Sequence, residues 1–95
     1  MAGGKRVRSL ESTKQADLDI KYWQSSGNLK VLARINKLIE AAIEEPARGI
    51  GKPERLKFHT IETYSRRIDR IHRLVYQVRE DQITIISARF HYVES

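Results

Sequence analysis

The end of the sequence brings together side chains that can bind a phosphate and transfer a proton. Arg89, His91 and Tyr92 follow an apolar run that favours a β-strand. An arginine stays charged and matches phosphate oxygens with its planar guanidinium, whereas an imidazole changes protonation near neutral pH. Glu54 and Arg73, further upstream, add a carboxylate and a second cation. A base, an acid and cations in one small chain indicate an RNA-cleaving site.

Alternation along the predicted strands decides which of these side chains share a face. Successive residues of a strand point to opposite faces of the sheet. If Leu74 and Tyr76 pack against helices, Arg73 points into a groove on the other face. Arg66 and Arg67 are also separated, one to each face, so both cannot line the same groove unless a bulge intervenes.

The same alternation makes a prediction for the aromatic residues. Phe90 is opposite in phase to Arg89 and His91, so we expect it to pack inward and anchor the tail. Trp23 lies at helical spacing with apolar neighbours and is predicted to belong to the core, as is Tyr76.

Two amphipathic helices are predicted in the first half of the chain. A capping box at Ser12 and Gln15 marks the start of the first helix, and residues 25–27 mark its end. Asn28 can cap the second helix, which Pro46 stops. The apolar faces that we expect in the core are Ala16, Ile20 and Trp23 in the first helix, and Val31, Leu32, Ile35, Leu38, Ile39, Ala42 and Ile43 in the second.

The pattern after Pro46 predicts an antiparallel sheet. Residues 47–53 contain two glycines and a proline and are predicted to be a loop. Strands are predicted at 64–68, 71–79 and 82–92, with shorter extended segments at 5–12 and 56–59. Helices grouped before such strands indicate an α+β fold, in which an N-terminal strand precedes a two-helix hairpin packed on one face of a small antiparallel sheet. The other face would then carry a polar groove.

Length and charge limit the classes of function. The 95 residues form one predicted domain, 1–95, with residues 1–6 flexible. Residues 48–92 hold ten lysines and arginines against five acids, so they carry +5 of the net charge of +6. This asymmetry favours nucleic acid or an acidic protein as a partner, and a solvated basic surface is the plain alternative.

Several classes of protein do not fit the composition. The chain has no cysteine, which excludes disulfides and thiolate metal sites, and its three histidines are scattered without metal-ligand spacing. No apolar run reaches the roughly 18 residues that span a bilayer. The basic start lacks the apolar segment of a secretory signal, and we expect a cytoplasmic protein with no metal and no cofactor.

Short motifs in a fixed order resemble one known family. They are Tyr22-Trp23-Gln24, Gly51-Lys52-Pro53-Glu54, Leu56-Lys57, Ser65-Arg66-Arg67-Ile68, His72-Arg73-Leu74-Val75-Tyr76 and Arg89-Phe90-His91-Tyr92. This ordered set is similar to the Txe/YoeB toxins of the RelE/ParE toxin–antitoxin superfamily. The resemblance implies a RelE/ParE-like fold and a ribosome-dependent, metal-independent endoribonuclease. Such an enzyme cleaves mRNA in the ribosomal A site by attack of the 2'-hydroxyl and thereby inhibits translation.

The resemblance also implies a role for each matching residue. Glu54 is expected to be the general base, His91 the general acid, and Arg73 the group that stabilises the phosphate, with Tyr92 beside them. Four further cations are expected to bind RNA: Lys52, Lys57, Arg67 and Arg89. His59 and His72 have no evident partner in the sequence and are interpreted as structural or surface residues.

The expected partners follow from the same family. They are a Phd/YefM-type antitoxin with an acidic and apolar segment, the ribosome with its mRNA, and a second copy of the chain in a homodimer, with no membrane. A binding toxin of the same fold is the alternative function, acting on a gyrase-type target or as an inactive RNA-binding module. The presence of both Glu54 and His91 favours the nuclease.

Overall fold

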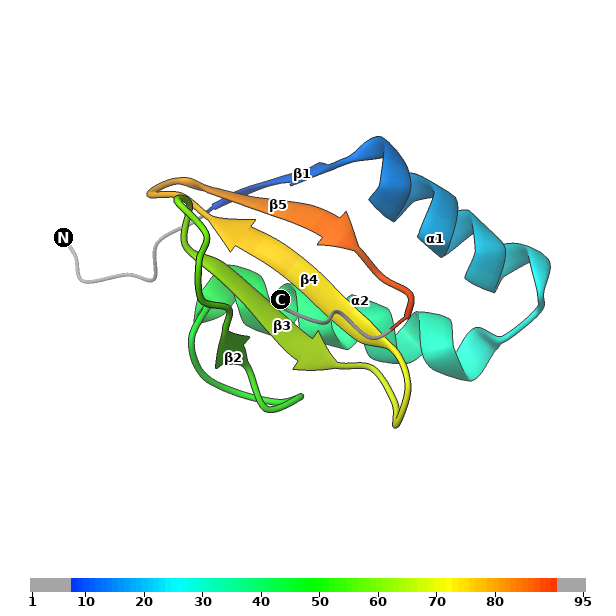
Figure 1. The fold of residues 1–95 in the computed structure, drawn as a ribbon. Coiled ribbons are helices and arrows are strands. Elements are labelled where there is room, and N and C mark those ends of the chain that lie inside the picture. The colour runs from blue at the N-terminus through cyan, green and yellow to red at the C-terminus, as the bar shows by residue number, and fades with distance from the viewer. Residues whose placement is uncertain (1–7, 91–95) are drawn as a thin grey trace, which may run out of the picture.

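A five-stranded sheet with two helices on one face makes up the computed structural model, which describes residues 8–90 (Figure 1). The elements are β1 (Ser9–Ser12), α1 (Lys14–Ser25), α2 (Leu29–Glu44), β2 (Glu54–Arg55), β3 (Thr63–Arg67), β4 (Arg73–Val78) and β5 (Gln82–Ser87). The sheet order is β1-β5-β4-β3-β2, and Figure 1 shows α2 behind the sheet. The predicted α+β class is confirmed.

The sheet is mixed, because β1 runs parallel to its neighbour. Ser9 pairs with Gln82 and Ser12 with Ile85, whereas β3, β4 and β5 form the predicted antiparallel part. The antiparallel β2 lies at 54–55, just before the extended segment predicted at 56–59, which is not a strand. Strands β1 and β5 lie at opposite ends of the described chain. No local turn motif could reveal their pairing, since a parallel pair needs a long connection.

The first helix begins one residue later than the sequence predicted. Ser12 still belongs to β1, and its hydroxyl donates to Asp17. Thr13 is the cap instead: its hydroxyl oxygen accepts the Ala16 N–H and its hydroxyl donates to the Ile86 carbonyl. One side chain therefore ends the edge strand, starts α1 and ties both to β5. The cap predicted for α2 is confirmed, as Asn28 accepts the Val31 N–H.

The core lies between the two helices and the face of the sheet that they cover. Leu38, Leu74, Tyr76 and Ile83 are completely buried. Trp23 is also buried, and its indole N–H donates to the Ala88 carbonyl at 2.9 Å, so its predicted place in the core is confirmed. Neither of the helices within residues 8–90 is long and apolar enough to cross a membrane.

Arg66 is an arginine buried inside this core. Its Nε donates to the Tyr76 hydroxyl at 2.8 Å, and its other nitrogens donate to the carbonyls of Glu45, Arg48 and Ile50 at 2.6–2.8 Å. A buried polar group must be hydrogen-bonded, or it costs free energy of folding. The guanidinium therefore fastens the loop that leads from α2 to β2 onto the middle of the sheet.

Tyr76 completes this network. Burial raises the pKa of its phenol above the ordinary value, although the nearby Arg66 opposes this, so the hydroxyl stays protonated and donates to the Pro46 carbonyl.

We expect Tyr76→Phe to lower the free energy of unfolding by about 1–3 kcal/mol, because Arg66 loses a buried acceptor while the ring remains. Urea unfolding of both proteins measures the change, and a loss below about 0.5 kcal/mol would contradict the role assigned to this hydroxyl.

Candidate active site

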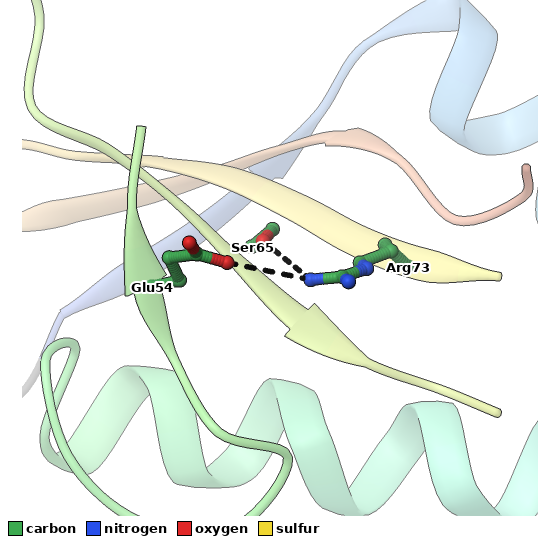
Figure 2. Close-up of polar contacts among 3 residues, drawn as sticks. All are labelled: Glu54, Ser65 and Arg73. Carbon is green, nitrogen blue, oxygen red and sulfur yellow. Dashed lines mark hydrogen bonds and ion pairs between the residues drawn. The ribbon is translucent and has the colours of Figure 1, made fainter. Parts of the chain in front are cut away.

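Glu54 and Arg73 meet on the face of the sheet that the helices leave uncovered. Nη1 of Arg73 lies 3.6 Å from Oε1 of Glu54 and 3.5 Å from the Ser65 hydroxyl oxygen. Figure 2 shows the guanidinium reaching from β4 across β3 toward the carboxylate on β2. The Arg73 side chain is only 16% exposed, whereas that of Glu54 is 68% exposed. A fixed cation thus stands beside a carboxylate that solvent and a ligand can reach.

Strand register explains why these side chains share a face. Leu74 and Tyr76 pack in the core, so Arg73 and Val75 point to the other side, as the alternation predicted. Ser65 pairs with Val75 across β3 and β4, and with Glu54 across β2 and β3. The same alternation sends Arg66 inward and leaves Arg67 exposed.

A glycine sets the approach of Glu54 to the sheet. Gly51 has a φ of +84°, and a Cβ at this position would lie 2.7 Å from Cδ2 of Leu38. Its carbonyl accepts the Arg67 N–H at 2.7 Å, which draws the loop against β3 three residues before Glu54. Only glycine meets both conditions at low cost, because other residues resist positive φ and no side chain fits there.

The other predicted cations lie around this pair. Lys52 and Lys57 are exposed on the segments that flank β2, and Arg67 is exposed at the end of β3. Within residues 8–90, none of the three contacts Glu54 or Arg73 through a side-chain hydrogen bond or ion pair. Their predicted contact with RNA stays a prediction.

The prediction that Phe90 packs inward is wrong. Its side chain is 58% exposed and its φ is +67°. Strand β5 ends at Ser87, before the predicted 92, so alternation no longer applies to the tail. Arg89 instead covers an aromatic ring of α1: its guanidinium carbon lies 3.4 Å from the centroid of the Tyr22 ring. A cation at this distance from a ring is attracted to its π face.

The segment at 88–90 is nevertheless fastened to the site. The buried carboxylate of Asp19 accepts the Ala88 N–H at 2.9 Å. Nδ1 of His72 accepts the Phe90 N–H at 2.7 Å, and the Phe90 carbonyl accepts the N–H of Arg73 at 3.1 Å. The described chain therefore ends beside the strand residue that carries the cation. His91 and Tyr92, the predicted acid and its neighbour, lie outside the described residues.

His72 is expected to hold this end of the chain through its unprotonated Nδ1. His72→Phe keeps an aromatic ring against Trp23, which His72 contacts edge-on, but removes the acceptor for Phe90. We expect a loss of about 0.5–1.5 kcal/mol in stability and faster hydrogen exchange at the amides of Phe90 and Arg73. His72→Asn, which can restore an acceptor, is the control. Unchanged exchange in His72→Phe would show that the bond does not hold the tail.

Three side chains near the site were missed by the sequence analysis. Ser65 supports Arg73, Asp19 holds residue 88, and His72 holds Phe90. Strand alternation places Ser65 on the same face as the predicted site and was a usable signal. The sequence signal for Asp19 is weaker. Asp19 is an acid that lies between Ala16 and Trp23 on the apolar face of a predicted helix. Nothing in the sequence indicates the contact of His72 with the tail.

The arrangement can take up a proton and hold an anion. The Glu54 carboxylate has open approach for a hydroxyl, and Arg73 can donate two parallel hydrogen bonds to a phosphate. In the part of the chain that the structure describes, no three histidine or acidic side chains gather as metal ligands do.

Comparison with known proteins agrees with the resemblance. The family model of the YoeB-like toxins of bacterial type II toxin–antitoxin systems matches residues 12–92. Toxin YoeB of Streptomyces coelicolor (strain ATCC BAA-471 / A3(2) / M145) is 47% identical over 74 residues, 78% of this chain and 87% of that protein. The structure of the YoeB dimer from Staphylococcus aureus matches with a TM-score of 0.80 and 41% identity, covering 90% of this chain and 98% of that one. The YoeB chain of a heterotetrameric YoeB–YefM toxin–antitoxin complex from the same organism matches with a TM-score of 0.78 and 40% identity, with the same coverage of both chains.

Proposed function

The chain belongs to the YoeB-like toxins of bacterial type II toxin–antitoxin systems, and we propose that it is a ribosome-dependent endoribonuclease that cleaves mRNA in the A site. The observation that carries this proposal is the meeting of Glu54 with Arg73 on the uncovered face of the sheet. A carboxylate alone or an arginine alone would be an ordinary surface residue. Side by side, they supply the base and the cation that cleavage of a phosphodiester needs.

Glu54 acts as the general base. Its exposed carboxylate removes the proton of a ribose 2'-hydroxyl, and the resulting oxygen attacks the adjacent phosphorus. The bond from phosphorus to the 5'-oxygen of the next nucleotide then breaks. The products are a 2',3'-cyclic phosphate and a 5'-hydroxyl, and no external nucleophile or metal ion takes part.

Arg73 stabilises the charge that builds up on the phosphate oxygens. Its partly buried guanidinium keeps one position through Ser65 and Glu54, so little reorganisation is needed when the phosphate binds. Donors held in place before the reaction are the effective way to stabilise a transition state.

His91 donates the proton to the leaving 5'-oxygen, with Tyr92 orienting the phosphate. The hydrogen bonds that join Phe90 to His72 and Arg73 support this assignment, because His91 follows Phe90 directly in the sequence. The cations that bind the rest of the RNA are Lys52, Lys57, Arg67 and Arg89.

The proposed partners are an antitoxin of the YefM type, the translating ribosome and a second toxin chain. Solved relatives support the antitoxin and the second toxin chain as partners. Chains similar in structure to this one occur in a YoeB–YefM complex and in a YoeB dimer. The basic half of the sequence is suited to an acidic antitoxin segment and to RNA alike. We propose that the protein acts in the cytoplasm, where translation takes place.

Cleavage of a defined message by purified ribosomes tests this function. The parent protein should cut the message in the A-site codon and leave a 2',3'-cyclic phosphate. Glu54→Gln keeps the size of the side chain but cannot accept the proton, so the single-turnover rate should fall by about 100- to 10,000-fold. Glu40→Gln, on the exposed side of α2, is the matched control and should cleave like the parent.

Two outcomes would overturn the proposal. The first is a Glu54→Gln variant that cleaves as fast as the parent. The second is a parent that arrests growth while translated messages stay intact, which would favour a binding toxin with another target.

A further inference from the structure

A basic pocket lies next to the proposed active site. It has a volume of about 510 Å³ and opens where residues 68–72 turn from β3 into β4. Its arginines come from four separate places: Arg34 from α2, Arg67 from β3, Arg70 from the turn and Arg73 from β4. Ile68 and Asp69 complete the lining. The pocket is thus continuous with Arg73, but Arg34 and Arg70 have no part in the proposed reaction.

The charge of the pocket favours an anion. Four arginines against one aspartate give a formal charge of +3. Oδ1 of Asp69 already accepts the N–H groups of Ile71 and His72, at 2.8 and 2.7 Å. Desolvation by itself would raise the pKa of Asp69, but these hydrogen bonds and the nearby His72 outweigh it and lower the pKa. Asp69 is therefore engaged in shaping the turn.

Of the four arginines of the pocket, Arg73 is paired with the Glu54 carboxylate, whereas the other three have no carboxylate partner among the described residues. Arg34 donates to the backbone carbonyl of Arg67 at 3.2 Å, which fixes α2 to the end of β3. Among residues 8–90, no carboxylate forms an ion pair with Arg34, Arg67 or Arg70. Their guanidinium groups keep donors available for a ligand, and a planar guanidinium fits phosphate oxygens in pairs.

We propose that this pocket is a second phosphate subsite, which binds a phosphodiester of RNA flanking the one held at Arg73. The inference deepens the proposed function and rests on it, since Arg73 would contact the cleaved phosphate. A water occupies about 30 Å³, so a pocket of about 510 Å³ holds a phosphate with several waters. A second anchored phosphate would fix the direction in which the strand crosses Glu54.

An RNA phosphate fits the lining better than an acidic peptide does. Protein segments bind through apolar or aromatic anchors that enter pockets of matching character. The apolar side chain of this lining is Ile68, which is buried in the core. The polar groups that remain accessible include the guanidinium groups of four arginines, the group best suited to a phosphodiester.

Binding measurements that need no cleavage test this inference. The probe is a message with a 2'-O-methyl group at the cleavage site, bound to ribosomes, with the affinity of the protein measured at several salt concentrations. Arg34→Gln and Arg70→Gln should each raise the Kd about 3- to 10-fold, because each removes one cation that binds a phosphate. The slope of log K against log[salt] should become shallower by about 0.7 for each arginine replaced. Arg79→Gln, on the turn after β4, is the control and should change neither quantity.

Measurements on ribosomes with and without message identify which RNA supplies the phosphate. An effect of Arg70→Gln that appears only on ribosomes carrying message assigns the phosphate to the message, whereas an equal effect on vacant ribosomes assigns it to ribosomal RNA. The first result supports the subsite proposed here, whereas the second would overturn its assignment to the phosphate that flanks the one at Arg73. Unchanged Kd and salt slope in both variants would overturn the proposal. It would also be overturned if the two substitutions weakened binding to a poly-glutamate peptide but not to RNA. Because the modified message cannot be cleaved, these results do not depend on whether the parent proves to be a nuclease.

Discussion

Arg73→Lys is expected to slow cleavage of ribosome-bound message by about 100- to 1,000-fold, the usual cost of removing one preorganised donor from a transition state. Lysine keeps the positive charge but loses the planar pair of donors. In the parent a single nitrogen, Nη1, contacts both Ser65 and Glu54, so the other guanidinium nitrogens are free to donate to the phosphate, and lysine has no counterpart to them. The loss should fall on the rate at saturating toxin more than on binding, because the charge on the phosphate grows in the transition state.

Stability should hardly change in Arg73→Lys, since its partner Glu54 is largely exposed and such pairs contribute about 0–1 kcal/mol. Single-turnover cleavage and thermal unfolding of the same preparations separate the two effects. Arg79→Lys makes the same chemical change just beyond the other end of β4 and should leave the rate unaltered. A lysine variant that cleaves within about threefold of the parent would remove Arg73 from the role proposed here.

Arg66→Met should be the most destabilising of the substitutions considered. Methionine fills part of the volume, but the carbonyls of Glu45, Arg48 and Ile50 and the buried Tyr76 hydroxyl lose their donor. A polar group left without its partner costs about 1–3 kcal/mol, so the loss of four hydrogen bonds should cost at least about 3 kcal/mol, a large part of the 5–15 kcal/mol that stabilises most domains. The midpoint of thermal unfolding should therefore fall by roughly 12 °C or more.

The neighbouring arginine provides the control for Arg66. Arg67 lies on the opposite face of β3 and is exposed, so Arg67→Met should change the free energy of unfolding by less than about 0.5 kcal/mol. Urea unfolding of both variants and the parent makes the comparison. Equal stability of Arg66→Met and Arg67→Met would mean that the buried network does not hold the loop before β2.

Much of this fold was predictable because helices and strands have local periods. The apolar faces of α1 and α2, the cap at Asn28 and the burial of Leu74 and Tyr76 were all anticipated. The start of α1 was predicted one residue early because Ser12 and Thr13 are both good caps, and pairing of Ser12 with β5 decided between them. The prediction for Phe90 failed because β5 ends at Ser87, so the alternation does not extend to residue 90.

The sequence by itself determined the α+β class, the family and the face to which Arg73 points, since these depend on periodicity and on motifs in a fixed order. Only the tertiary structure decided that Glu54 lies 3.6 Å from Arg73, that Arg66 is enclosed by backbone carbonyls, and that β1 joins β5 in parallel. It also decided that four arginines share one pocket. The physical reason is distance along the chain. Period and propensity act over a few residues, whereas these contacts join segments that meet only when the loops close and the core packs.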